Sequence, residues 1–309
     1  MGVYQHLTEF AGLPVAEFGV SGPPSEEALA SPSSYAWAVR SGYDEESFAD
    51  LWPKFLEAVD TSGITALVIG YWGIYDDKVD VPKLLSGSAS ALPALRSLFL
   101  GDIVQEEAEI SWIQHSDTTP VFTAFPALER VEVRGAAGLS FEPVESEALR
   151  TLRFESGGLP ASVVRTVGRS TLPHLEHLDL WLGASEYQGD ATVKDLEPFL
   201  TGANLPRLRH LGLEDAEIQD EIAAAVAGAP VVARLESLSL AMGMLTDTGA
   251  EALLSGQPLT HLKRLDLHYH FLEEPMVERV RAALPGVEVN LDDRHVFDPD
   301  DGFYVEVSE

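Results

Sequence analysis

The sequence predicts a single α/β solenoid, in which strand and helix units stack side by side into a curved, right-handed structure. Two observations predict it: an apolar motif recurs along most of the 309 residues, and segments with helical spacing separate its copies. A third supports it, because 45% of the residues are hydrophobic and can supply a continuous core. The apolar runs are too short to cross a bilayer.

The recurring motif is Leu-x-x-Leu-x-Leu, with apolar residues at its first, fourth and sixth positions. Clear copies begin at Leu95, Leu149, Leu175, Leu208, Leu235 and Leu262, and weaker copies begin at Ile64, Leu128 and Leu284. Successive copies start 21 to 33 residues apart, against roughly 20 to 29 residues in leucine-rich repeats. Alternation within each copy predicts a short strand whose apolar side chains face the core. We therefore expect about nine units.

Between the motifs, apolar residues recur at helical spacing, for example over residues 193–200 and 277–284. A repeated order of strand and helix predicts a parallel sheet. One unit cannot bury its own leucines, so neighbouring units must stack to form the core. We expect the sheet on the concave side and the wider helices on the convex side.

Both ends of the stack need caps, because terminal leucines would otherwise face water. We expect an N-terminal cap over residues 1–60, the solenoid over 61–291 and an acidic C-terminal cap over 292–309. The first cap should contain a strand at 36–40 and a helical stripe at 48–59, with Pro53 as a candidate break. The last should contain a strand from Phe303 to Val307 after a turn.

One segment carries a resemblance to a known family. Leu245-Thr-Asp-Thr-Gly-Ala-Glu-Ala-Leu-Leu254, after its motif, resembles a repeat of ribonuclease-inhibitor-like leucine-rich-repeat proteins, and the likeness extends over roughly residues 60 to 291. Ile110-Ser-Trp-Ile113 and Leu178-Asp-Leu-Trp-Leu-Gly183 are similar to an uncharacterised family of cytoplasmic, mostly actinobacterial, leucine-rich-repeat proteins. The resemblance implies a horseshoe fold and brings no activity. Genes of that family often neighbour radical-SAM enzyme genes, which implies an accessory role.

Composition limits the classes of function. Fifty acidic and twenty basic residues give a net charge of -30, which disfavours nucleic acid and anionic membranes and favours basic partners, although the charge also serves solubility alone. The absence of cysteine excludes disulfides, thiolate metal sites and cysteine nucleophiles. The first residues lack the pattern of a targeting leader, so we expect a cytoplasmic protein.

The variable positions of each motif should form the inner face of the sheet, where we look for binding residues. The candidates are Arg130, Arg134, Arg153, His177, Asp179, Trp181, His210, Glu214, Arg264, Asp266 and His268. Trp181, with Arg153 and the two histidines beside it, forms a central patch of residue types that anchor interfaces. The alternative is a solvated polar ladder that merely stabilises the sheet.

His177 and His210 occupy equivalent positions of adjacent strands, so they should lie about 5 Å apart, with Asp179 on the same face. Such a trio suits a metal ion or proton transfer. Two histidines and a carboxylate also arise readily by chance on such a face, so we assign no metal ligand and no cofactor. His268 and His270 are interpreted as solvated residues of the last turns.

The common phosphate-loop, dinucleotide, zinc-protease and nucleophile-elbow motifs do not occur. We therefore expect no catalytic residues and no enzyme, a metal- or His/Asp-dependent hydrolase being the weakest alternative. The expected function is protein-protein interaction, in which a monomer binds a protein or peptide on its concave sheet. The rims and the convex face are other places for a partner. The alternative function is a small-molecule- or metal-binding accessory protein to a neighbouring enzyme, such as a radical-SAM enzyme.

Overall fold

The computed structural model describes residues 3–20, 22–42, 46–73, 79–299 and 302–309. The chain is an α/β protein whose strands are mostly parallel. It divides into two compact units, an N-terminal unit of residues 2–151 and a C-terminal unit of residues 152–308, and each is described by itself. Among the described helices, none combines the length and apolar character needed to span a membrane.

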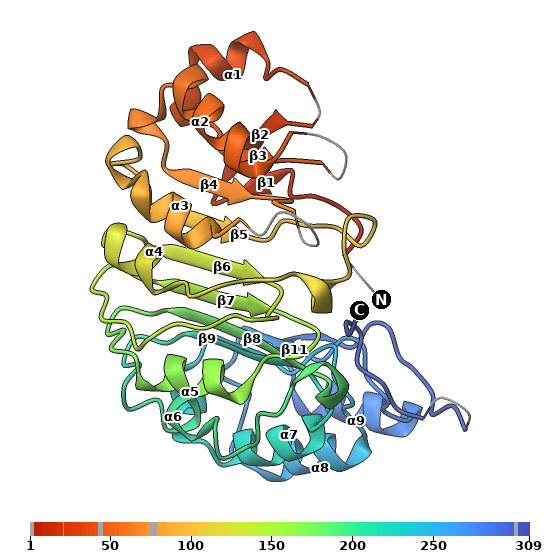
Figure 1. Cartoon of the computed structure of the whole chain (residues 1–309). Helices are drawn as coiled ribbons and strands as arrows, with labels where there is room; N and C mark the ends of the chain where they lie inside the picture. The colour runs from red at the N-terminus through yellow and green to blue at the C-terminus, as the bar shows by residue number, and fades with distance from the viewer. Residues whose placement is uncertain (1–2, 21, 43–45, 74–78, 300–301) are drawn as a thin grey trace. The chain divides into compact units, whose positions relative to one another are not determined.

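The N-terminal unit begins with the antiparallel pair β1 and β2 and continues with parallel strands in chain order. Its strands are β1 (Glu9–Phe10), β2 (Leu13–Gly19), β3 (Ala36–Arg40), β4 (Ala66–Ile69), β5 (Ser97–Leu100) and β6 (Arg130–Arg134). Its helices are α1 (Glu26–Ala30), α2 (Phe48–Ala58), α3 (Val81–Gly87) and α4 (Thr119–Ala124). Figure 1 shows them, from red to yellow, beside the strands.

The first segment of this unit confirms the predicted strand at 36–40 and adds a strand, β2, that we did not predict. Helix α2 is continuous, so the predicted break is wrong. Pro53 removes one backbone hydrogen bond, and the buried side chains of Phe48, Trp52 and Phe55 hold the helix together despite that loss. Ser47 caps its first turn by accepting from the amide of Asp50.

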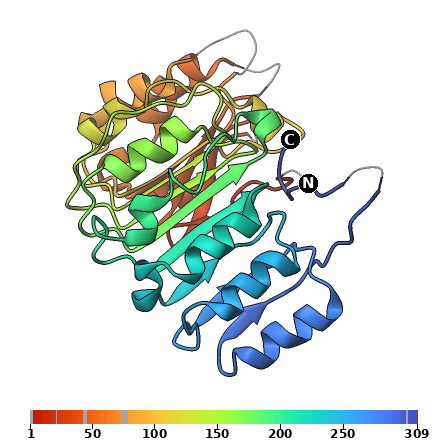
Figure 2. The same cartoon turned by 90° about the horizontal axis from the view of Figure 1, so that it is seen from below.

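In the C-terminal unit, strands β8 to β12 are parallel and pair in chain order. The strands are β7 (Thr151–Glu155, which starts at the unit boundary), β8 (His177–Gly183), β9 (His210–Ala216), β10 (Ser237–Ser239), β11 (Arg264–Asp266) and β12 (Glu288–Asn290). The helices are α5 (Ala161–Arg169), α6 (Glu197–Thr201), α7 (Gln219–Ala227), α8 (Asp247–Ser255) and α9 (Glu274–Ala283). In Figure 2 the helices from green to blue lie on one side of these strands.

The strand register of the C-terminal unit aligns the motif leucines in a row across the sheet. Leu178 pairs with Leu211, Leu211 with Leu238, and Leu238 with Leu265. All four are buried on the core face, and each such leucine contributes about 1.5 to 3 kcal/mol through burial. The residues one position earlier form a second row on the opposite face, beginning with His177 and His210. The functional candidates lie on that face.

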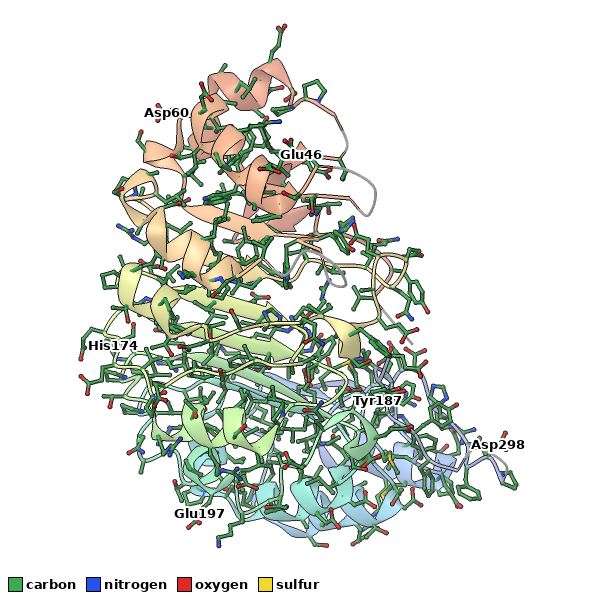
Figure 3. The ribbon with its side chains drawn as sticks, viewed as in Figure 1. Glu46, Asp60, His174, Tyr187, Glu197 and Asp298 are labelled. Atoms are coloured by element: carbon green, nitrogen blue, oxygen red, sulfur yellow. The ribbon has the colours of Figure 1, made fainter. Side chains whose placement is uncertain are left out.

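The segment from Phe303 to Val307 is not a strand, so that prediction is wrong. Val305 and Val307 are buried, as alternation requires, but the amide of Glu306 donates to the carbonyl of Met242 and the amide of Val307 donates to Asp215 Oδ1. These partners are a loop and a side chain rather than a neighbouring strand, so no ladder forms. Asp298, which precedes this segment in the chain, lies at the outer edge of the C-terminal unit (Figure 3).

Candidate functional site

The exposed face of β8 to β11 carries an open hollow of about 560 Å³. Its charged and aromatic lining is Arg153, His177, Asp179, Trp181, His210, Glu214, Arg264, Asp266 and His268. Nine of the eleven residues predicted for the inner face therefore meet at one place in the C-terminal unit. The other two, Arg130 and Arg134, lie on β6 of the N-terminal unit.

Asp179 joins two histidines at the floor of the hollow. Strand register places His177 beside His210 and Asp179 beside Gly212. His177 Nε2 donates to Asp179 Oδ2 over 2.6 Å, and His210 Nε2 donates to Asp179 Oδ1 over 2.6 Å. Two imidazoles on adjacent strands thus direct the same nitrogen at one carboxylate, because parallel pairing puts positions 177 and 210 side by side.

Neighbouring groups fix the orientation of both rings. The imidazoles of His177 and His210 stack face to face, with centroids 4.0 Å apart and planes 11° from parallel. The second ring nitrogen of His210, Nδ1, lies 2.7 Å from Ser237 Oγ on β10. A ring that is held at both nitrogens and at one face has a single orientation available.

Asp179 is 5% exposed, so its charge depends on its partners. Burial alone would raise its pKa, but the hydrogen bonds from His177 and His210 outweigh burial and hold the pKa of Asp179 below its ordinary value. The carboxylate is therefore ionised at neutral pH. An anion under two imidazoles at the bottom of an open hollow is an arrangement that attracts cations.

Gly212 leaves the space that the Asp179 carboxylate occupies. A Cβ at position 212 would lie 2.1 Å from Asp179 Oδ1 and 3.2 Å from the carboxyl carbon of Glu214. Both distances are shorter than ordinary contacts between these atoms. The absent side chain thus allows two carboxyl groups to approach the same stretch of β9.

Trp181 is part of the wall of the hollow rather than an exposed anchor. It is 7% exposed, its Nε1 donates to Glu214 Oε2 over 2.8 Å, and the guanidinium of Arg153 lies 5.2 Å from its ring centroid. Burial, together with the negative charge of Asp179, raises the pKa of Glu214 to about 7. The buried indole therefore has a structural role. The carboxyl group that accepts its hydrogen bond has a pKa near neutral pH.

A second histidine and carboxylate pair lies on the β11 side of the hollow. His268 Nδ1 lies 2.8 Å from Asp266 Oδ1, and its Nε2 lies 3.5 Å from Glu306 Oε2. Hydrogen bonds with these two carboxylates raise the pKa of His268 to about 10. The interpretation as a solvated residue is wrong for His270, which is completely buried and whose Nε2 donates to the carbonyl of Leu291. The side chain of His268 is 28% exposed.

No family model matches the sequence, and no curated protein matches it. Among solved structures, the chain is similar to a Bacteroides fragilis protein whose crystal structure came from a structural genomics consortium, with 30% identity and a TM-score of 0.82. The alignment covers 93% of this chain and 81% of that protein. The chain belongs to the family of this Bacteroides fragilis protein.

The N-terminal unit contains a buried cluster of charged side chains whose contacts the sequence did not predict. Arg40 binds Asp102 and Glu17, while Asp102 also receives the guanidinium of Arg134 and the backbone amide of Leu7. Arg40 and Asp102 are 1% and 0% exposed. Asp102 follows the motif strand, and Arg40 lies outside every motif, so their contact follows only from tertiary structure. The opposite charges are paired, although Nε of Arg40 has no hydrogen-bond partner, and buried pairing of this kind is typical of a structural role.

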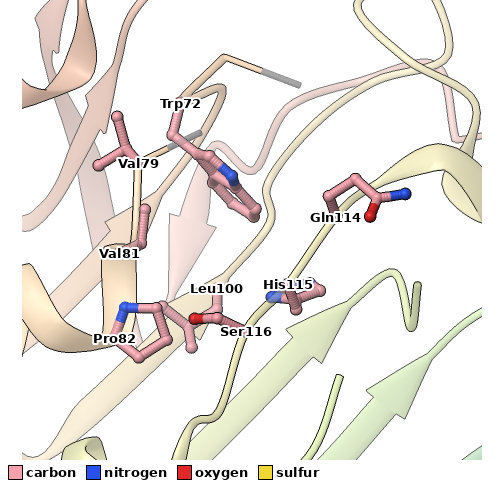
Figure 4. A pocket seen from close by; sticks show the side chains of 8 residues that line it. All are labelled: Trp72, Val79, Val81, Pro82, Leu100, Gln114, His115 and Ser116. Carbon is pink, nitrogen blue, oxygen red and sulfur yellow. The ribbon is translucent and has the colours of Figure 1, made fainter. Parts of the chain in front are cut away.

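A second hollow in the N-terminal unit lies between Trp72 and His115 (Figure 4). Its volume is about 10 Å³, room for about one water molecule. Burial lowers the pKa of His115 to about 4, and its Nε2 donates to the carbonyl of Arg134 over 2.8 Å. This cavity is too small for a ligand. Another hollow of the same unit, beside Gly19, Arg40 and Leu51, has a volume of about 260 Å³. The hollow on β8 to β11 is larger and contains the cluster of His177, Asp179 and His210, so it is the candidate site.

Proposed function

We propose that this chain is a non-catalytic binding protein of leucine-rich-repeat architecture, which holds a small ligand in the hollow of the C-terminal unit and acts as an accessory to an enzyme. The observation that carries the proposal is the convergence of His177, Asp179 and His210 on one point at the floor of that hollow. Sites for small ligands are concave and have a few polar groups in fixed positions. This site has both features.

The leucine-rich-repeat architecture, as a horseshoe of about nine units, is itself proposed from the motif and from a recurring turn. Left-handed backbone occurs at Asp215, Met242 and Tyr269, each two residues after the last leucine of its motif. The amides of these residues donate to the carbonyls of Ala241, His268 and Asp292 in the next turn. The same unusual conformation at a spacing of 27 residues supports a structural repeat.

The size and the lining of the hollow favour a small ligand over a flat protein interface. A volume of about 560 Å³ matches a small molecule or an ion with its water molecules. Protein interfaces depend on exposed aromatic anchors, whereas Trp181 is already packed against Arg153 and bonded to Glu214. The polar groups at the floor, rather than the indole, are the available contacts.

Thermal unfolding tests this function. Protein treated with a chelator and then dialysed would be melted alone and with a panel of divalent metal chlorides, free amino acids and nucleoside monophosphates. We expect at least one compound to stabilise the wild type, by about 2.7 kcal/mol when its concentration is 100 times its Kd. His210→Ala should lose the stabilisation, and Arg165→Ala, on the outer surface of α5, should keep it. Equal stabilisation of the wild type and both variants would rule out the hollow as the binding site.

Binding of a protein or peptide, which the sequence predicts as the main function and places on the concave sheet, is the second function that we propose, and an exposed apolar group elsewhere in the C-terminal unit supports it. The side chains of Val296, Phe297, Phe303 and Tyr304 are 69%, 51%, 38% and 44% exposed. Phe303 packs against both Phe297 and Phe271 with centroids 4.9 Å apart, so the group is contiguous. Contiguous exposed apolar groups mark interaction surfaces. The charge of -30 would favour a basic partner.

Partner capture separates this second function from the first. Immobilised wild type, Phe297→Ser/Tyr304→Ser and His210→Ala proteins would be incubated with the same lysate. A protein captured by the wild type but lost from the first variant would support docking on the apolar group, whereas loss from His210→Ala alone would place it on the strand face. Identical capture by all three proteins would contradict both positions.

A further inference from the structure

This inference rests on the proposed small-ligand function. We propose that the ligand is a divalent transition-metal ion of the zinc class, coordinated by Nε2 of His177, Nε2 of His210 and a carboxylate oxygen of Asp179. The geometry of the hollow supports this ligand.

The ligand atoms already surround one point. Among the described residues, these three side chains form the group whose possible ligand atoms all lie within 4.8 Å of one another. Zinc binds imidazole nitrogen and carboxylate oxygen at about 2.0 to 2.2 Å, so small outward shifts suffice. Two imidazoles and one carboxylate select zinc, cobalt or nickel over calcium or magnesium, which prefer oxygen ligands alone.

The groups around the ligands resemble the outer shell of a metal site. Metal-bound histidines usually donate the N–H of their other ring nitrogen to an oxygen, which fixes the tautomer. Ser237 Oγ lies 2.7 Å from Nδ1 of His210 and would accept that N–H when the ion replaces the proton on Nε2. Stacking on His210 aligns the ring of His177 in the same direction. The side chains are therefore arranged before an ion arrives.

Charge also favours a cation at this point. The carboxyl groups of Asp179 and Glu214 both approach the point that a Cβ at position 212 would occupy, 2.1 Å from Asp179 Oδ1 and 3.2 Å from the carboxyl carbon of Glu214. A cation beside Asp179 would offset the repulsion between two carboxylates this close together. The side chain of His177 is 39% exposed, so an ion can reach this point from solvent.

Three protein ligands leave the fourth position of a tetrahedral ion open toward the hollow. Structural zinc sites are closed by four protein ligands, whereas an open position takes water or a donor atom from another molecule. This count argues against a purely structural role, and it is compatible with a binding protein whose ion contacts a second molecule.

The hollow contains a matched control with the same side-chain types. His268 also contacts two carboxylates, but Asp266 lies at its Nδ1 and Glu306 at its Nε2. These nitrogens are on opposite sides of the ring, so the two carboxylates cannot share one ion with it. Substitution of His268 should therefore leave metal binding intact although it changes the same hollow.

Titration with cobalt(II) and zinc(II) tests the proposal on the full chain, with stoichiometry and Kd from calorimetry and ligand type from the visible absorption of cobalt. We expect one ion per chain and tetrahedral cobalt bands. His177→Gln, His210→Gln and Asp179→Asn should each weaken binding by about 100-fold, and Ser237→Ala by about 10-fold. His268→Gln should match the wild type. Circular dichroism checks that every variant is folded.

Three outcomes would overturn the metal site: no binding by the wild type, equal binding by Asp179→Asn, or loss of binding in His268→Gln but not in His210→Gln. If a ligand of another class stabilises the wild type and not His210→Ala in the melting panel while zinc and cobalt do not bind, the ion proposal fails and the small-ligand function stands. If no compound acts on the hollow, both fail. Ser237→Ala, which removes no ligand, keeps the test valid if a ligand variant unfolds.

Discussion

The carboxylate of Asp179 occupies the space that a side chain at position 212 would fill, since a Cβ there would lie 2.1 Å from Asp179 Oδ1. Gly212 belongs to β9 and is the register partner of Asp179 on β8. The cluster thus depends on a residue that donates no ligand atom and carries no charge.

Gly212→Ala is expected to displace the Asp179 carboxylate, lower stability by about 1 to 3 kcal/mol and abolish cobalt binding. The matched control is Gly228→Ala at the end of α7, where a Cβ meets nothing within 4 Å. Urea denaturation and the cobalt spectrum measure the two effects. Normal cobalt binding by Gly212→Ala would show that the position of the carboxylate does not matter.

Glu214→Gln should change how stability depends on pH. Burial and Asp179 raise the pKa of Glu214 from 4.5 to about 7 in the folded chain. The folded state therefore holds a proton that the unfolded chain releases, and the wild type loses stability as pH rises from 4.5 through 7. Between pH 4.5 and pH 8, we expect the wild type to lose roughly 1 to 3 kcal/mol of its free energy of unfolding relative to the variant. Urea denaturation of both proteins at the two pH values measures this loss. A difference between the two proteins that is the same at both pH values would contradict it.

His268→Gln should have its largest effect below the pKa of an unfolded histidine. Asp266 and Glu306 raise the folded pKa of His268 from 6.5 to about 10, so its stabilisation is complete below pH 6.5 and disappears as pH rises through 10. Because the side chain is 28% exposed, we expect the substitution to lower the free energy of unfolding by only about 1 to 2 kcal/mol at pH 6. Denaturation of the wild type and the variant at pH 6 and pH 10.5 measures this difference. The reverse trend would exclude these ion pairs in solution.

Arg40→Met should destabilise the N-terminal unit strongly, because it removes a partner of the buried Asp102 carboxylate. Removing one side of a buried ion pair costs about 3 to 5 kcal/mol. Lys54→Met provides the control, since the Lys54 pair with Glu46 is largely exposed and should matter little. Chemical denaturation of both variants compares the sites, and equal small losses would show that the buried group is not a source of stability.

The sequence was sufficient for the strands that carry the motif and for the residues that share a face of them. A strand lies at each of the nine motifs, and the alignment of His177 with His210 follows from equal positions in consecutive motifs. Strands of period 2 fix the side on which each residue lies, so Asp179 joined the histidines as predicted. The candidate trio could therefore be predicted from the sequence.

Other features depend on contacts that no local pattern encodes. The burial of Trp181 follows from Arg153 and Glu214 on neighbouring strands, and the irregular C-terminal segment follows from Asp215 and Met242. The space at Gly212 was present in the sequence only as a glycine at a variable motif position. Its role required the direction of the Asp179 side chain, which strand register alone does not give.

Anomalous diffraction from wild-type crystals grown with zinc, measured at the zinc absorption edge, would locate the ion directly. We expect one strong peak within bonding distance of His177 Nε2, His210 Nε2 and Asp179, with an open position toward the hollow. Crystals in which zinc is absent from this point, or is bound only elsewhere on the acidic surface, would contradict it.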